Sequence, residues 1–248
     1  MKRFFNWQVG LGILLIILSA IVYLIHFLLF KDAHHIFIYL VGDIAFVFLE
    51  VLFVTLILHQ LLKYREKQSL LKKLNMVIGT FFSEVGVELL KLLSEFDEQA
   101  SKISKKLIIE TNWSDKRFKK AKEELTLHKC SVDIKKGVLE TLKTFLLSKR
   151  QFLLTLLENP NLLEHESFTD FLLAAFHLTE ELSFRKSLKG LPDTDYQHLC
   201  GDIKRAYNLL IIEWLVYMKH LKKDYPYLFS LAVRTNPFDE NASIEVTY

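Results

Sequence analysis

Two long apolar runs occupy the first quarter of the chain, and a short polar link separates them. The first run, Trp7 to Phe30, has 24 residues and contains no Asp, Glu, Lys or Arg. The second, Ile36 to Leu58, has 23 residues, of which 17 are Ile, Leu, Val or Phe. With a rise of 1.5 Å per residue, either run is long enough to cross a hydrocarbon layer of about 30 Å. The pattern predicts two transmembrane helices, at about 7–30 and 36–60.

The link KDAHH (31–35) is so short that the two helices must run antiparallel. Cations flank the pair on both sides: Lys2 and Arg3 before it, and Lys63, Arg65, Lys67, Lys72 and Lys73 after it. Because Lys and Arg are enriched on the cytoplasmic side of membrane helices, both termini are expected in the cytoplasm. A cleaved signal peptide is disfavoured, since its apolar core spans only about 7–15 residues. Residues 1–62 are therefore expected to form a multi-pass hairpin in a cytoplasmic membrane of the bacterial or archaeal type.

The second run carries two carboxylates, Asp43 and Glu50, near its middle. They are seven residues apart, so they share one helix face about 10 Å apart along the axis, and Tyr39 lies one turn before Asp43. Each acid costs about 2.5–3.5 kcal/mol at the centre of a membrane, whereas each large apolar residue contributes roughly 0.3–0.6 kcal/mol. The segment is thus expected to insert by a narrow margin and to gain stability from a partner helix.

The first run also has a polar stripe, formed by Ser19, Tyr23 and His26. In a hairpin centred near residue 33, Tyr23 comes level with Asp43 and His26 with position 40, so both are expected to bind Asp43, while Glu50 meets an apolar position. Intramembrane acids often mark a proton or ion path. They also act as polar contacts between helices, each contributing about 0.6 kcal/mol and at most about 1.7 kcal/mol. Both interpretations stay open, and Glu50, without a partner in its own hairpin, is the better place to look for function.

After the hairpin, apolar residues recur every three or four positions, at Leu71, Leu74, Ile78, Phe81, Val85, Leu89, Leu92 and Phe96. This spacing predicts an amphipathic helix with a seam close to a heptad repeat. Gly79, Ser83 and Gly86 form a separate small-residue face, which permits close contact with a helix of a second copy or of the same chain. A helix lying on lipid headgroups is a further option. We assign residues 63–110 to this juxtamembrane, coiled-coil-like helix.

Four more amphipathic segments follow, at about 114–128, 132–157, 167–187 and 195–223. They are separated by helix-stop signals and preceded by cap signals such as Ser114. Only 8 Gly and 4 Pro occur in 248 residues, which also favours long helices with few turns. Residues 111–248 are expected to form a four-helix-bundle-like domain with an extended C-terminal tail. The whole chain is therefore expected to be all-α.

The first of these segments carries a dense group of cations around Phe118: Lys116, Arg117, Lys119, Lys120 and Lys122. The group is either a patch for anionic lipid headgroups, at about 1 kcal/mol per cation near the surface, or a solvated helix face whose apolar side is buried. No nucleic-acid partner is expected, because the net charge is only +3 and no RNA- or DNA-binding pattern is present.

No catalytic motif is found, so no enzymatic activity is expected. His177 with Glu181, and His198 with Asp202, have the i, i+4 spacing that can supply two metal ligands. Such pairs are common by chance on charged helix faces, and the sequence predicts neither a metal nor another cofactor. Two cysteines 70 residues apart, Cys130 and Cys200, are expected to be reduced thiols.

These features favour an integral membrane protein whose hairpin tethers an all-α cytosolic interaction or regulatory module. Its expected partners are the lipid bilayer and either a second copy or another protein, through the cytosolic helices. The alternative is a homo-oligomeric proton or cation channel, or a transport subunit, in which Asp43 and Glu50 face the pathway.

Overall fold

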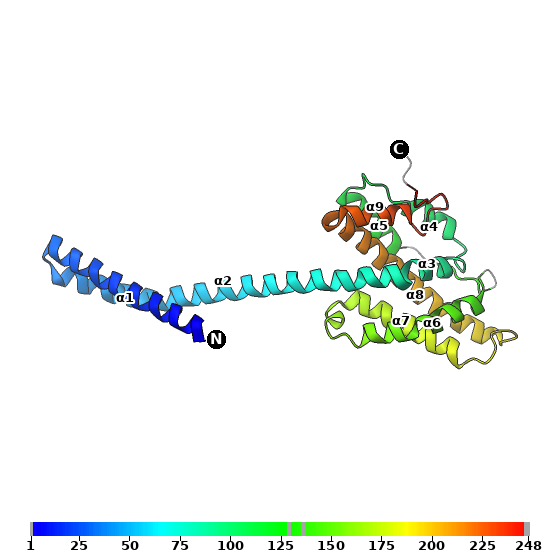
Figure 1. Ribbon diagram of the computed structural model, residues 1–248, viewed down its shortest axis with the longest axis horizontal. Helices are drawn as coiled ribbons and strands as arrows, with labels where there is room; N and C mark the ends of the chain where they lie inside the picture. The colour runs from blue at the N-terminus through cyan, green and yellow to red at the C-terminus, as the bar shows by residue number, and fades with distance from the viewer. Residues whose placement is uncertain (1, 128–129, 135–136, 246–248) are drawn as a thin grey trace. The chain divides into compact units, whose positions relative to one another are not determined.

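A computed structural model describes residues 2–127, 130–134 and 137–245 (Figure 1). Within these residues every regular element is a helix, and the only β-type pairing is an isolated bridge between Asp97 and Val132. The expected all-α class is confirmed. The chain divides into two compact units, an N-terminal unit (Met1–Lys67) and a C-terminal unit (Gln68–Tyr248).

The N-terminal unit consists of α1 (Lys2–Phe30) and the first part of α2 (Ala33–Phe81). Two residues connect them. Lys31 has a φ of +49°, the left-handed conformation that commonly ends a helix, and Asp32 accepts a hydrogen bond from the His35 backbone N–H at 3.2 Å, which caps α2. The link is therefore shorter than the five residues expected.

Helix α2 also extends beyond the end expected near residue 60. No Gly or Pro occurs between Gly42 and Gly79, so nothing in the local sequence interrupts the helix. Two helical stretches, Val9–Phe30 and one beginning at Ala33, are long and apolar enough to cross a membrane by length and composition. None of the described side chains between residues 7 and 62 is buried.

The C-terminal unit begins with the last part of α2, followed by a π-helical turn, η1 (Phe82–Gly86), α3 (Val87–Ser94) and α4 (Ala100–Leu107). The single helix expected over 63–110 is thus interrupted twice. The apolar seam is nevertheless buried as its spacing predicted, from Leu74 through Phe96, while the side chain of Leu71 lies outside the described residues. The seam packs inside this unit, against α6 and α8, so its burial requires no second chain.

The small-residue face of this segment also meets its own domain. Gly79 lies against the ring of Tyr217, whose hydroxyl oxygen is 3.5 Å from where a β-carbon would stand. The rings of Phe82 and Tyr217 stack, with centroids 4.7 Å apart. Of the two options that the sequence left open for this face, the structure contains the contact within one chain.

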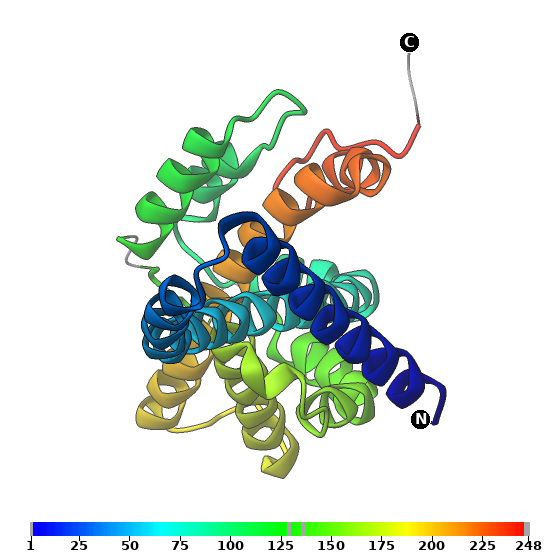
Figure 2. The ribbon, with the colours of Figure 1, turned by 90° about the vertical axis from the view of Figure 1, so that its left-hand side faces the viewer.

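The remaining helices are α5 (Asp115–Thr126), α6 (Leu139–Leu157), α7 (Glu166–Phe184), α8 (Asp193–Asp224) and α9 (Pro226–Arg234), with a 3₁₀ turn, η2 (Leu162–Glu164), before α7. Helix α8 is central and packs against α3, α5, α7 and α9, while α6 packs against α7 and α3. In both views α5 and α9 lie on one side of α8, and the α6–α7 hairpin lies on the other (Figures 1 and 2). The core therefore includes α2 and α3, and residues 111–248 do not form a bundle by themselves.

Two local differences from the expected boundaries have clear causes. Helix α6 begins at Leu139 and not near 132, because residues around Val132 pair with Asp97 and Gly137 packs against the ring of Phe96. Helix α9 was not expected, although Pro226 at its first turn is a common helix start.

The tail after α9 is partly anchored and not simply extended. The Asn236 side-chain amide donates to the Leu107 carbonyl at 2.8 Å, and Phe238 packs against Trp214 with centroids 4.9 Å apart. Residues 246–248 lie outside the described chain. The first few residues of the tail are thus part of the packed core.

Candidate functional site

Four aromatic and imidazole rings lie together near the turn between α1 and α2. His26 is half-buried, and its ring lies 4.8 Å from that of Phe30 and 6.0 Å from that of His35. His35 in turn contacts Tyr39, with ring centroids 4.6 Å apart. These four rings form a short ladder at the closed end of the hairpin.

The described part of the hairpin has no hydrogen bond or ion pair joining Asp43 or Glu50 to a side chain of α1. Both carboxylates are exposed, as are Ser19 and Tyr23. The expected contact of Asp43 with Tyr23 and His26 is therefore not present in this structure. The two-residue link shifts the register on which that expectation depended.

The basic group on α5 starts from a helix cap that the sequence predicted. The Ser114 hydroxyl accepts a hydrogen bond from the Arg117 backbone N–H at 3.3 Å, and the Arg117 guanidinium lies 5.0 Å from the centre of the Trp113 ring. Phe118 is buried, with 2% of its surface exposed, so the apolar side of the helix faces the core. All five cations are exposed.

Three of the five cations, Lys116, Lys119 and Lys122, border a hollow of about 460 Å³ between α5 and α8. Its apolar lining includes Leu215 and Val216 of α8. A fourth lysine that the sequence analysis did not single out, Lys219, also borders it and pairs with Asp115 at 3.3 Å. An apolar lining with a basic rim suits an anion that carries an apolar part. Arg117 and Lys120 do not line this hollow.

The strongest concentration of titratable side chains lies between α7 and α8. His177 and Glu181 are one turn apart on α7, and His198 and Asp202 are one turn apart on α8. Both imidazole Nε2 atoms approach the same oxygen, Asp202 Oδ2, from 3.6 Å (His177) and 3.3 Å (His198). The Glu181 carboxylate lies 3.9 Å from His177 Nε2 and 3.6 Å from His198 Nε2.

Two arginines lie beside this group, and only one of them is firmly bound. Arg185 donates to Glu181 at 2.7 Å and to Asp195 at 2.6 Å, and its hydrogen bond lowers the pKa of Glu181. Arg205, which is largely exposed, lies 3.4 Å from the other Asp202 oxygen. We call the group His177, Glu181, His198 and Asp202 the α7–α8 cluster. The sequence contained its two halves as i, i+4 pairs, but only the packing of the helices brings them together.

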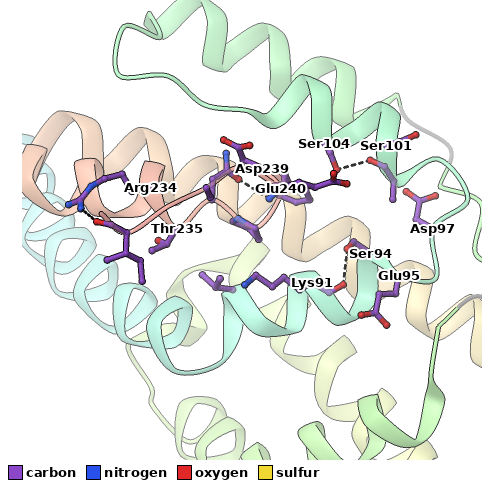
Figure 3. A pocket seen from close by; sticks show the side chains of 17 residues that line it. Lys91, Ser94, Glu95, Asp97, Ser101, Ser104, Arg234, Thr235, Asp239 and Glu240 are labelled. Atoms are coloured by element: carbon purple, nitrogen blue, oxygen red, sulfur yellow. Dashed lines mark hydrogen bonds between the residues drawn. The ribbon is translucent and has the colours of Figure 1, made fainter. Parts of the chain in front are cut away.

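A larger groove of about 800 Å³ runs between α3, α4 and the segment after α9 (Figure 3). Side chains of both charges line it: Lys91, Glu95, Asp97, Arg234, Asp239 and Glu240. Arg234 is already engaged, since its guanidinium donates to the Ile244 carbonyl. The mixed charge selects no single class of ligand, and no sequence pattern links segments so far apart in the chain.

The thiol of Cys130 is buried. Burial, with a contribution from the nearby Asp97 carboxylate, raises the pKa of Cys130 to about 12, so the thiol is protonated at neutral pH. Cys200 is half-buried, and burial raises its pKa as well. Neither cysteine forms a disulfide in the described chain.

Comparison with known proteins yields two family models. One is described as the N-terminal helical domain of MJ1433 and matches residues 2–62, and the other is described as the C-terminal helical domain of the uncharacterized protein MJ1433 and matches residues 70–234. The uncharacterized protein MJ1433 of Methanocaldococcus jannaschii is 50% identical over 239 residues, which cover 96% of each chain. No solved structure matches the chain.

Proposed function

The chain belongs to the MJ1433 family, and we propose that it is an integral membrane protein whose N-terminal hairpin tethers a helical binding module in the cytosol. The observation that carries this proposal is the exposure of the two apolar helices. Ile16, Phe48 and Val41 have 71%, 75% and 68% of their surfaces exposed, respectively, and the large apolar residues around them are exposed as well. A core helix of a soluble protein would bury such residues, because their exposure to water is unfavourable.

The proposed topology places the Lys31–Asp32 link outside and both termini in the cytosol. It is supported by the cations that follow the second apolar run, against the single acid Glu66 among them. With so short an external segment, the binding function falls to the C-terminal unit.

Topology can be tested with single-cysteine variants of the full chain in intact cells. In a background of Cys130→Ala and Cys200→Ala, Lys31→Cys is expected to react with a membrane-impermeant maleimide. Its matched control, Lys186→Cys in the exposed α7–α8 connection, should react only after the membrane is opened. An alkaline carbonate wash should leave the protein in the membrane fraction. Release by carbonate, or labelling of both sites in intact cells, would contradict the proposal.

We further propose that the hollow between α5 and α8 binds anionic lipid headgroups. Lys116, Lys119, Lys122 and Lys219 surround an apolar lining, and each cation near an anionic surface contributes about 1 kcal/mol. Full-length protein in nanodiscs should be more heat-stable with phosphatidylglycerol than with phosphatidylcholine. The combined Lys119→Gln and Lys122→Gln variant should lose most of this difference, whereas Lys120→Gln, outside the hollow, should keep it. If the two lipids differ equally in their effect on both variants, the hollow is excluded as the headgroup-binding site.

A second candidate function is ion or proton transport through an oligomer. It is favoured by one observation, that neither Asp43 nor Glu50 has a side-chain partner on α1 in the described hairpin. Reconstituted vesicles should then show a flux that Asp43→Asn and Glu50→Gln reduce. An oligomer in mild detergent is also required, since two helices cannot enclose a pore. A monomer, or flux that is unchanged by both substitutions, would exclude this function.

A further inference from the structure

We propose that His177, His198 and Asp202 bind one divalent transition-metal ion between α7 and α8. The three ligand atoms are the two imidazole Nε2 atoms and Asp202 Oδ2, and all three lie within 4.8 Å of one another. Two nitrogens and one carboxylate oxygen are donors that suit Zn²⁺ and its first-row neighbours. Ca²⁺ and Mg²⁺, which favour oxygen ligands alone, are not expected to bind.

Two of the three separations between the ligand atoms match those around a tetrahedral ion. Metal–ligand distances of about 2.0–2.1 Å place neighbouring ligands of a tetrahedral Zn²⁺ about 3.4 Å apart. His177 Nε2 and His198 Nε2 lie 3.6 Å and 3.3 Å from Asp202 Oδ2, respectively, and the two nitrogens lie within 4.8 Å of each other. Direct N–H···O hydrogen bonds are usually shorter, at 2.7–3.2 Å. The three side chains thus converge on a point between them without forming close mutual hydrogen bonds.

Asp202 is the residue that most requires a cation. Its side chain is only 3% exposed, and Oδ2, the oxygen that faces both imidazoles, has no hydrogen-bond donor among the described residues. Arg205 approaches the other oxygen from 3.4 Å and is itself 61% exposed. A buried carboxylate is costly unless it is paired or coordinates a metal. A bound ion supplies the missing positive charge where Oδ2 points.

The two histidines leave the ion a route from solvent. Their side chains are 46% and 51% exposed, so a fourth coordination position faces outward and can hold water or a further ligand. Glu181 is near both rings, but Arg185 holds its carboxylate at 2.7 Å. We therefore assign Glu181 the role of a neighbouring negative charge and not of a ligand. The supporting helices α7 and α8 pack directly on one another, which keeps the ligands in place.

The proposal can be tested with full-length protein in detergent, purified without a polyhistidine tag. Titration of Zn²⁺ against a chromogenic chelator should reveal one site per chain, and Co²⁺ should give the visible absorption of a low-coordinate ion with nitrogen and oxygen ligands. Asp202→Asn, His177→Gln and His198→Gln should each weaken Zn²⁺ binding by about 10-fold or more. Glu180→Gln should bind Zn²⁺ as tightly as wild type. Glu180 is the neighbour of Glu181 on α7, but it does not belong to the cluster and pairs instead with Arg150, at 3.5 Å.

Thermal unfolding is a second measurement, which shows whether a variant that does not bind Zn²⁺ is nevertheless folded. Zn²⁺ binding to the folded state should raise the thermal midpoint of the wild type and of Glu180→Gln. Because both histidines are about half exposed, their Gln variants are expected to fold, and Zn²⁺ should leave their midpoints unchanged. The proposal is overturned if wild type binds Zn²⁺ no more tightly than these two variants, which would leave the cluster as an ion-pair network only.

Discussion

At the residue scale, the most informative side chains are two buried polar groups, one in a helix and one in the C-terminal tail. Glu213 is 2% exposed on α8, and Asn236 is 3% exposed in the segment after α9. Neither residue stands out in the sequence, since single polar residues interrupt most amphipathic stripes. Their energetic effect depends on what surrounds them, and it leads to two predictions.

Glu213→Gln is expected to stabilise the C-terminal unit at neutral and alkaline pH. Burial is the main cause that raises the pKa of Glu213 above its ordinary value of 4.5, despite a hydrogen bond with Ser167 and the nearby charge of His165. With a folded-state pKa above the unfolded-state value, the folded state loses stability as the pH rises through the folded-state pKa. Gln carries no charge and avoids this loss.

The measurement is the free energy of unfolding of wild type and Glu213→Gln between pH 4 and pH 8. The advantage of the variant should be largest at pH 8 and should shrink toward pH 4, where Glu213 is mostly protonated in both states. Glu140→Gln, at an exposed position of α6, serves as the control. A variant that is less stable than wild type at pH 8 would contradict this account.

Asn236→Ala is expected to reduce the free energy of unfolding by about 1–3 kcal/mol. Its amide donates to the Leu107 carbonyl at 2.8 Å, and its side-chain oxygen accepts from the Phe238 backbone N–H at 2.9 Å, so the substitution leaves buried groups without partners. Chemical denaturation followed by circular dichroism measures the change. Asn241→Ala, an exposed position nearby, should be close to neutral, and equal effects of the two substitutions would rule out anchoring by Asn236.

At the element scale, the π-helical turn η1 explains the first of the two interruptions in the helix that was expected over 63–110. The widened turn brings the rings of Phe81 and Phe82 so close to Gly86 that a β-carbon there would stand 2.7 Å and 2.5 Å from them, respectively. Glycine is therefore required by local packing and not by a left-handed backbone, because Gly86 has ordinary helical angles. The spacing of the apolar residues did not predict this turn, because a single π-helical turn within a helix uses the same kinds of apolar residue as the α-helix around it.

Gly86→Ala should accordingly destabilise the C-terminal unit by about 1–3 kcal/mol, the usual cost of overpacking a core. Thermal unfolding is the measurement. The control is Gly201→Ala in α8, where a β-carbon meets nothing within 4 Å and removal of a helix-interior glycine should be neutral or stabilising. A neutral result at Gly86 would mean that the two phenylalanine rings move aside freely.

At the scale of the whole molecule, the boundary between the two units lies before the apolar seam. The seam residues were expected in a separate coiled-coil-like helix, yet Leu89 and its neighbours are part of the core that α8 organises. An amphipathic stripe indicates that the apolar face of a helix is buried, but it does not indicate which other helices cover that face. The covering surface here comes from α6 and α8, which begin at Leu139 and Asp193, far beyond the seam in the chain.

Leu89→Ala should reduce the free energy of unfolding of the C-terminal unit by about 2–5 kcal/mol, because the side chain is 1% exposed and its removal leaves a cavity. Tryptophan fluorescence, to which the buried Trp113 and Trp214 contribute, can follow the transition. The midpoint should not depend on protein concentration. A concentration-dependent midpoint would indicate that the seam is buried between chains, as in a coiled coil.

The sequence by itself determined the helical class, the two long apolar stretches and the buried seam, because each depends on residues close together in the chain. It also placed the α5 cap, and it placed α5, α7 and α8 to within a few residues. Only the tertiary structure decided that α8 is central, that the tail is anchored through Asn236, and that the two His–carboxylate pairs meet at Asp202. These features depend on contacts between distant helices, and a pattern of local spacing contains no information about which faces will pack together.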